Sequence, residues 1–198
     1  MTAANANIRQ TASPLRSDVL LVLFLIGFDV VARLLLHVPN VSPVAASALF
    51  AGMMLHRRSL APVVPLAAML IGDLLIGFDD WRVAAVVYAA MVLPALAGIL
   101  ASRYRPSRVV VPAVVACSLI FFATTNLAVW AFGGLYSLDM AGLMQCYTLA
   151  LPFLKYTMAG DLLWAAVLFG GAWLVQRLTE RGASAGAAPR AGAGSGAL

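Results

Sequence analysis

Residues 109–132 read VVVPAVVACSLIFFATTNLAVWAF, an apolar run without a charged residue. A helix over this run would be about 36 Å long at 1.5 Å per residue, enough to cross the roughly 30 Å hydrocarbon core of a bilayer. Further apolar runs cover residues 17–36, 43–55, 62–78, 83–101 and 155–178. The sequence therefore predicts an all-α, polytopic transmembrane helix bundle of about six spans.

The composition agrees with a membrane protein. Hydrophobic residues make up 63% of the chain and charged residues only 11%, against roughly 25% charged residues in a soluble domain. The net charge of +5 comes from short basic clusters between the apolar runs, which is typical of topology signals and not of a nucleic-acid-binding face. A soluble enzyme and a nucleic-acid binder are therefore excluded. We expect the first run to be retained as a span, because Asp29 and Arg33 interrupt the apolar core that a cleaved signal peptide would need.

The chain divides into a cytoplasmic tail at 1–16, a transmembrane domain at 17–181 and a Gly- and Ala-rich tail at 182–198 that we expect to be disordered. The 13-residue run at 43–55 is short for a crossing, so we expect it to thin the bilayer or to be shielded by neighbouring helices. Residues 139–154 are too apolar for an ordinary loop and too short to cross and return. We predict that they form an interfacial or re-entrant helix ended by Pro152.

Lys and Arg are distributed unevenly between the two sides of this six-span arrangement. Ten arginines fall on one side: Arg9, Arg16, Arg57, Arg58, Arg103, Arg105, Arg108, Arg177, Arg181 and Arg190. Only Arg33, Arg82 and Lys155 fall on the other. The positive-inside rule then predicts that both termini lie in the cytoplasm, as expected of a multi-pass protein of the bacterial inner membrane.

Polar side chains from five of the six predicted helices fall at one depth, on the order of 7 to 11 Å below the outer boundary at 1.5 Å per residue. They are Asp29, Asp73, Tyr88, Asn126 and Asp161. Ionisable groups inside spans are costly and are functional candidates by default. Their common depth predicts a substrate-binding pocket that opens toward the outer face.

Structural interpretations of the same residues stay open. Asp29 and Arg33 are spaced to pair along one helix, and Asn126 could bond across helices only to hold them together. Asp73 and Asp161 could also form the carboxylate pair of an intramembrane enzyme, although both sites lack the fuller Gly-x-Gly-Asp motif of such proteases. The small residues Ala48 and Gly52 predict close helix packing, more commonly within one chain than with a partner.

No motif for a cofactor, a metal or a nucleotide is present. Cys146 has no His or Cys companion that would make a metal site. The chain also lacks the Gly-x-x-x-x-Gly-Lys-Ser/Thr loop that cradles nucleotide phosphates, so any ATP-driven step would belong to a partner.

Several segments resemble a family of uncharacterised bacterial membrane proteins, a domain of unknown function. The resemblance rests on residues 40–45 (NVSPVA), 48–52 (ALFAG), 65–78 (PLAAMLIGDLLIGF), 125–130 (TNLAVW), 142–146 (GLMQC) and 151–169. It covers roughly residues 20–177. That family is in turn similar to the substrate-binding S components of energy-coupling-factor (ECF) vitamin transporters.

The resemblance to S components implies six helices that hold a vitamin near the outer face, with a gate after the first helix. On this chain the gate would be residues 37–42, with Asn40 as its polar residue. A small-residue face would contact an energy-coupling transmembrane subunit with its ATPases, but the first helix lacks the expected Ala-x-x-x-Ala pattern. We therefore expect a membrane transport protein, and not an enzyme, that takes up a small solute through Asp29, Asn40, Asp73, Tyr88, Asn126 and Asp161. The alternative functions are a structural or assembly subunit and an intramembrane enzyme using Asp73 and Asp161.

Overall fold

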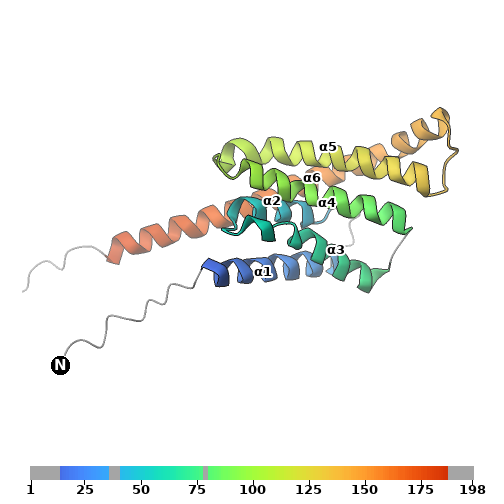
Figure 1. Ribbon diagram of the computed structural model, residues 1–198. Helices are drawn as coiled ribbons and strands as arrows, with labels where there is room; N and C mark the ends of the chain where they lie inside the picture. The colour runs from blue at the N-terminus through green and yellow to red at the C-terminus, as the bar shows by residue number, and fades with distance from the viewer. Residues whose placement is uncertain (1–13, 36–40, 78–79, 187–198) are drawn as a thin grey trace, which may run out of the picture.

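The computed structural model describes residues 14–35, 41–77 and 80–186, and this part of the chain is all-helical (Figure 1). The described residues contain six α-helices and one short 3-10 helix, and no strand occurs among them. The helices are α1 (Pro14–Leu35), α2 (Val44–Met54), η1 (Arg58–Leu60), α3 (Val63–Ile76), α4 (Trp81–Ala101), α5 (Pro106–Phe132) and α6 (Met140–Gly186).

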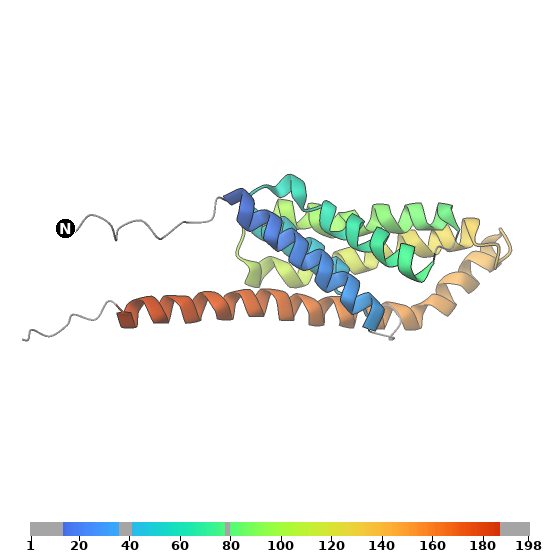
Figure 2. The same ribbon diagram turned by 90° about the horizontal axis from the view of Figure 1, so that it is seen from below.

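Successive helices run in alternating directions along one long axis (Figures 1 and 2). The start of α1, the α2–α3 and α4–α5 connections and the end of α6 lie at one end of the bundle, which we call the arginine end because Arg57, Arg58, Arg103 and Arg105 occupy it. The start of α2, the end of α3, the start of α4 and the α5–α6 connection lie at the other end, the distal end.

α2 is the innermost helix, and every residue from Ala46 to Gly52 is buried. Glycines let α4 approach it closely: a Cβ on Gly52 would overlap the Ala95 carbonyl oxygen and come within 2.9 Å of the Gly98 Cα. The face formed by Ala48 and Gly52 is therefore used for packing inside the chain. Neighbouring helices also shield this short helix, so its 11 residues need not match the bilayer by themselves.

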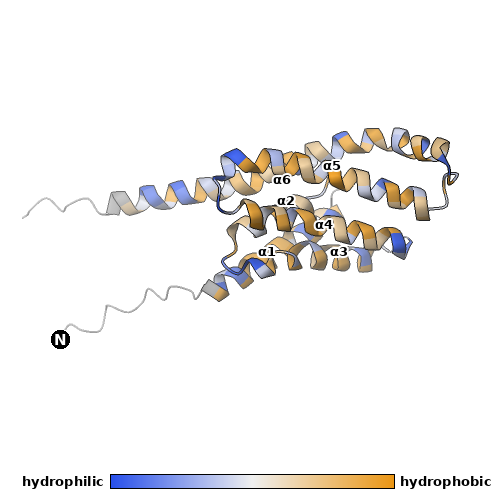
Figure 3. Ribbon diagram, turned by 45° about the horizontal axis from the view of Figure 1, so that its top comes forward, coloured by the Kyte–Doolittle hydropathy of each residue, from blue (hydrophilic) through white to orange (hydrophobic). Residues whose placement is uncertain are grey.

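Most of the bundle consists of apolar residues (Figure 3), and many large apolar side chains are exposed, at least one of them on every helix from α1 to α6. Four helical segments among the described residues are long and apolar enough to cross a membrane: Arg58–Ile76, Trp81–Ala101, Pro106–Phe132 and Met140–Ala183. α2 is apolar but shorter than these, and α1 carries Arg16, Asp18, Asp29 and Arg33 within its 22 residues. The predicted all-α fold class is confirmed, and the described residues have the apolar helices of a membrane protein.

The predicted separate helix at 139–154 is wrong. α6 is one 47-residue helix that passes through Pro152, with a bend in its earlier part (Figure 2). A proline inside a helix removes one backbone donor and kinks the helix without having to end it. α6 also continues to Gly186, so residues 182–186 of the predicted disordered tail are helical, and the rest of that tail lies outside the described residues.

The start of α6 is fixed by Asp139. Its carboxylate accepts hydrogen bonds from the Gly142 amide at 2.7 Å and from the Ser137 hydroxyl at 2.9 Å. The amide hydrogen bond to Gly142 lowers the pKa of Asp139 below its ordinary value. This side chain satisfies a donor in the first turn of α6, as an N-cap residue does.

Candidate functional site

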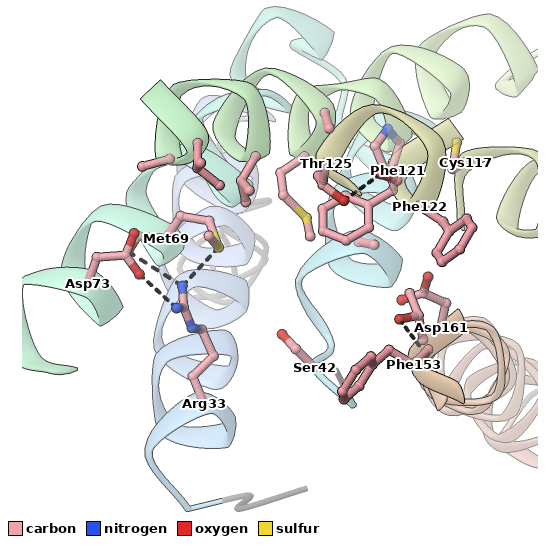
Figure 4. Close-up of a pocket in the computed structure, with 18 of the residues that line it drawn as sticks. Arg33, Ser42, Met69, Asp73, Cys117, Phe121, Phe122, Thr125, Phe153 and Asp161 are labelled. Carbon is pink, nitrogen blue, oxygen red and sulfur yellow. Dashed lines mark hydrogen bonds and ion pairs between the residues drawn. The ribbon is translucent and has the colours of Figure 1, made fainter. Parts of the chain in front are cut away.

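A partly open cavity of about 590 Å³ lies in the half of the bundle nearer the distal end, and Figure 4 shows it in close-up. All six α-helices contribute to its lining. The volume is within the range of about 300–1,000 Å³ that is usual for small-molecule sites. Ionisable side chains stand at two places on its wall, which we call the Asp73 side and the Asp161 side.

On the Asp73 side, both carboxylate oxygens of an α3 residue have partners. The Arg33 guanidinium of α1 donates to Asp73 Oδ1 at 2.7 Å, and the Tyr88 hydroxyl of α4 donates to Asp73 Oδ2 at 2.8 Å. Arg33 also approaches the Met69 sulfur at 2.8 Å. The charge of Asp73 is therefore balanced by Arg33, and the pairing of Asp29 with Arg33 considered above is replaced by this contact between helices.

A glycine makes room for this ion pair. A Cβ on Gly72 would lie 3.0 Å from the Arg33 guanidinium carbon, so the absence of a side chain there lets the guanidinium lie flat against α3. Gly160 has a comparable place on α6, because its Cβ would lie 3.1 Å from the Val41 Cα. The two Gly-Asp steps at 72–73 and 160–161 thus each combine a close approach with an acid on the cavity wall.

On the Asp161 side, the acid has a neutral partner. Asp161 is 6% exposed, and its Oδ2 lies 2.6 Å from the Ser118 hydroxyl oxygen. The same hydroxyl lies 2.9 Å from the Val114 carbonyl, and one hydroxyl proton cannot be donated fully to both acceptors. Among the described residues no cation forms an ion pair with Asp161.

The two acids stand on opposite sides of the cavity, with apolar side chains between them (Figure 4). Phe121 and Phe122 of α5 and Phe153 of α6 line the cavity on the side nearer Asp161. Thr125 and Asn126 also line the cavity, and each donates to a carbonyl of its own helix, at 2.7 and 2.8 Å. Their remaining acceptor atoms give the wall a polar strip beside the aromatic rings.

The structure brings only part of the predicted polar layer to this cavity. Asp73, Asn126 and Asp161 line it, and Tyr88 stands behind Asp73 as its hydrogen-bond partner. Asn40 lies outside the described residues, as do residues 37–39 of the predicted gate, while Val41 and Ser42 line the cavity.

Asp29 is turned away from the cavity and lies between α1 and α2. It is fully buried, and the Ser47 hydroxyl donates to its Oδ1 at 2.7 Å. Its Oδ2 has no hydrogen-bond partner among the described residues. Asp29 is therefore not among the residues that line this cavity, because depth along a helix does not specify which face a side chain occupies.

Sequence reasoning missed two residues that the site depends on, Arg33 and Ser118. Ser118 had a usable signal: it precedes Thr125 and Asn126 by seven and eight residues, so the three share one face of α5. Arg33 is four residues from Asp29, and this local spacing concealed its actual partner on α3. Among the described residues no group of three or more His, Cys, Asp or Glu side chains could hold a metal ion.

Comparison with known proteins gives a family and nothing further. A family model described as a family of unknown function (DUF6580) matches residues 13–183. No curated protein and no solved structure matches the chain.

Proposed function

We propose that this chain, which belongs to the family of unknown function DUF6580, is a membrane transport protein that binds a small, vitamin-sized solute in the cavity between Asp73 and Asp161. The membership in a family of unknown function agrees with the resemblance in the sequence. Since the comparisons supply no activity and no link to S components, the proposed function rests on the cavity and on the arrangement of the helices.

The proposed topology has six crossings, with both termini in the cytoplasm of a bacterial cell and the bundle in the inner membrane. The alternating directions of α1 to α6 (Figures 1 and 2) support it, as does the concentration of arginines at one end. α1 has exposed apolar residues on its outer side, including Leu20, Leu23 and Phe24. With the arginine end in the cytoplasm, the cavity lies in the outer half of the membrane, where a solute from outside could enter.

Asp161 is the observation that carries the proposal. A buried carboxyl group whose partner is a serine, on the wall of a cavity of about 590 Å³, is a polar anchor that a ligand can complete. The Arg33–Asp73 pair is already balanced, so, as far as the described residues go, the cavity has one acid without a cationic partner. We propose a solute with a hydrogen-bond donor or a cationic group for Asp161 and a flat apolar body for Phe121 and Phe153.

Uptake in the manner of S components would also need an energy-coupling transmembrane subunit with ATPases. The small-residue face of α2 is covered by α4, so such a subunit would have to dock on another surface. This partner remains a proposal, and a carrier that works alone is its alternative.

The arrangement of these residues fits the two alternative functions less well. An intramembrane enzyme needs Asp73 and Asp161 to share one water, but they stand on opposite sides of the cavity (Figure 4), and both oxygens of Asp73 are engaged. A purely structural subunit has no need of a cavity that a close-packed interior would fill.

The test is mass spectrometry of small molecules that co-purify with the wild-type protein, an Asp161→Asn variant and an Asp139→Asn variant. Asp139 immediately precedes α6, the helix that carries Asp161, but lies outside the cavity, and an asparagine there can still accept the hydrogen bond from the Gly142 amide, so Asp139→Asn is a matched control. We expect a compound retained by the wild type and the control and reduced at least tenfold in Asp161→Asn. Equal retention by all three proteins would show that Asp161 does not bind the solute. No retained compound, with no stabilisation by a panel of vitamins, would favour the structural subunit.

A further inference from the structure

We infer that the groove between α5 and α6 at the arginine end is a binding site for an anionic phospholipid. This groove is separate from the cavity and lies in the opposite half of the bundle. Its volume is about 940 Å³. The inference does not depend on which solute the cavity binds.

The walls of the groove suit an acyl chain. Val110 and Val111 of α5 face Leu162, Ala165 and Phe169 of α6. Gly170 also lines the groove, and a Cβ added to it, or to Gly171, would meet no atom within 4 Å. Glycine inside a helix is less favourable than alanine, and no close helix contact here requires it. Gly170 therefore leaves open space beside the apolar wall of the groove.

The mouth of the groove suits a phosphate. Arg105 at the start of α5 and Arg177 on α6 line it, and Arg103 and Arg108 are exposed beside Arg105. The lining has one acid, Glu180, which accepts a hydrogen bond from Gln176 at 3.3 Å. The arginines of the lining outnumber this acid. Basic pockets between helices on the cytoplasmic side are a known setting for anionic headgroups.

Trp173 marks the level of the membrane interface at this groove. Trp173 is 58% exposed, and the Arg177 guanidinium lies 5.4 Å from the centre of its ring, one turn further along α6. Tryptophan is enriched where the hydrocarbon core meets the headgroups. The groove is therefore apolar on the membrane side of Trp173 and cationic on the water side, which is the polarity of a phospholipid.

The experiment is native mass spectrometry of the full chain released from bilayers of equal parts phosphatidylglycerol and phosphatidylcholine. We expect the wild type to retain phosphatidylglycerol preferentially. In an Arg105→Gln, Arg177→Gln variant its affinity should fall about 30-fold, since each arginine near a membrane surface contributes roughly a fivefold effect. An Arg57→Gln, Arg58→Gln variant, with the same loss of charge at the same end but outside the groove, should retain the lipid.

A second variant tests the apolar wall of the groove. A Cβ on Gly170 would meet no atom within 4 Å, so we expect Gly170→Leu to fold normally and, by filling the groove, to lose the lipid. The proposal would be overturned if both lipids were retained equally by the wild type, or if the Arg57, Arg58 control lost phosphatidylglycerol as strongly as the groove variants. A second copy of the chain could occupy the groove in place of the lipid, and it would be seen as a dimer that Gly170→Leu abolishes. That result would overturn the proposal and assign the groove to self-association.

Discussion

Arg33 holds α1 to α3 through a side chain that is only 18% exposed, paired with an Asp73 side chain that is 14% exposed. Removing one member of a buried pair leaves an uncompensated charge, which is far more costly than removing both. Within a membrane this asymmetry is reinforced, because lipid cannot solvate the remaining group. The pair is therefore a determinant of the distal end of the bundle, whatever the solute is.

The corresponding prediction concerns a double-mutant cycle. Arg33→Met and Asp73→Leu should each lower the free energy of unfolding by about 3 kcal/mol, and the double variant should be more stable than either single variant. Unfolding by sodium dodecyl sulfate in mixed micelles measures this. The exposed Arg82–Asp80 pair at 2.8 Å is the control, with little coupling expected. Additive effects of Arg33→Met and Asp73→Leu would contradict the prediction.

The sequence predicts how far along its helix each site residue lies, but not toward which neighbour its side chain points. Asp73, Asn126 and Asp161 line one cavity, and the common depth predicted for them followed from position along a helix of known rise. Asp29 has the same depth, but it faces Ser47 and α2. Its direction depends on how α1 is rotated about its axis, and the spacing of residues within α1 carries no information on the partner helix.

At the scale of the elements, the apolar runs gave the approximate positions of the helices, because each run reflects burial in lipid or in the bundle. The ends were harder to predict. Pro152 was expected to end a helix, but α6 continues through it to Gly186. A single proline removes one hydrogen bond, whereas the neighbouring turns of a long apolar helix keep theirs.

The contact between α2 and α4 should be sensitive to a single methyl group. Gly52→Ala would place a Cβ against the Ala95 carbonyl oxygen and within 2.8 Å of the Ile99 amide nitrogen. Overpacking of this kind costs about 1–3 kcal/mol, so the variant should unfold at lower detergent concentration. Gly27→Ala on α1, where a Cβ would meet no atom within 4 Å, should be neutral or slightly stabilising. Equal stability of the two variants would mean that α2 and α4 do not pack this closely.

At the scale of the whole molecule, the open question is whether α1 and α2 form a pair of crossings. Composition alone argues against α1, since it has four charged residues. The structure supplies partners for three of them: Asp18 accepts from the Arg57 amide at 2.7 Å, Asp29 from Ser47, and Arg33 donates to Asp73. A charged helix can cross a membrane when its polar groups face protein, and these contacts meet that condition.

Cysteine labelling of the full chain in intact cells would separate the possible topologies, starting from a Cys117→Ala, Cys146→Ala background. With six crossings, a membrane-impermeant maleimide should label Ser42→Cys and Tyr136→Cys from outside, and reach Arg57→Cys and Tyr104→Cys only after lysis. If α1 and α2 do not cross, Ser42→Cys alone changes to the protected class. If α1 crosses and α2 does not, every site after α2 inverts, which would place ten arginines mostly outside, against the positive-inside rule. Ser42 is thus the informative position, because four crossings and six crossings agree everywhere else.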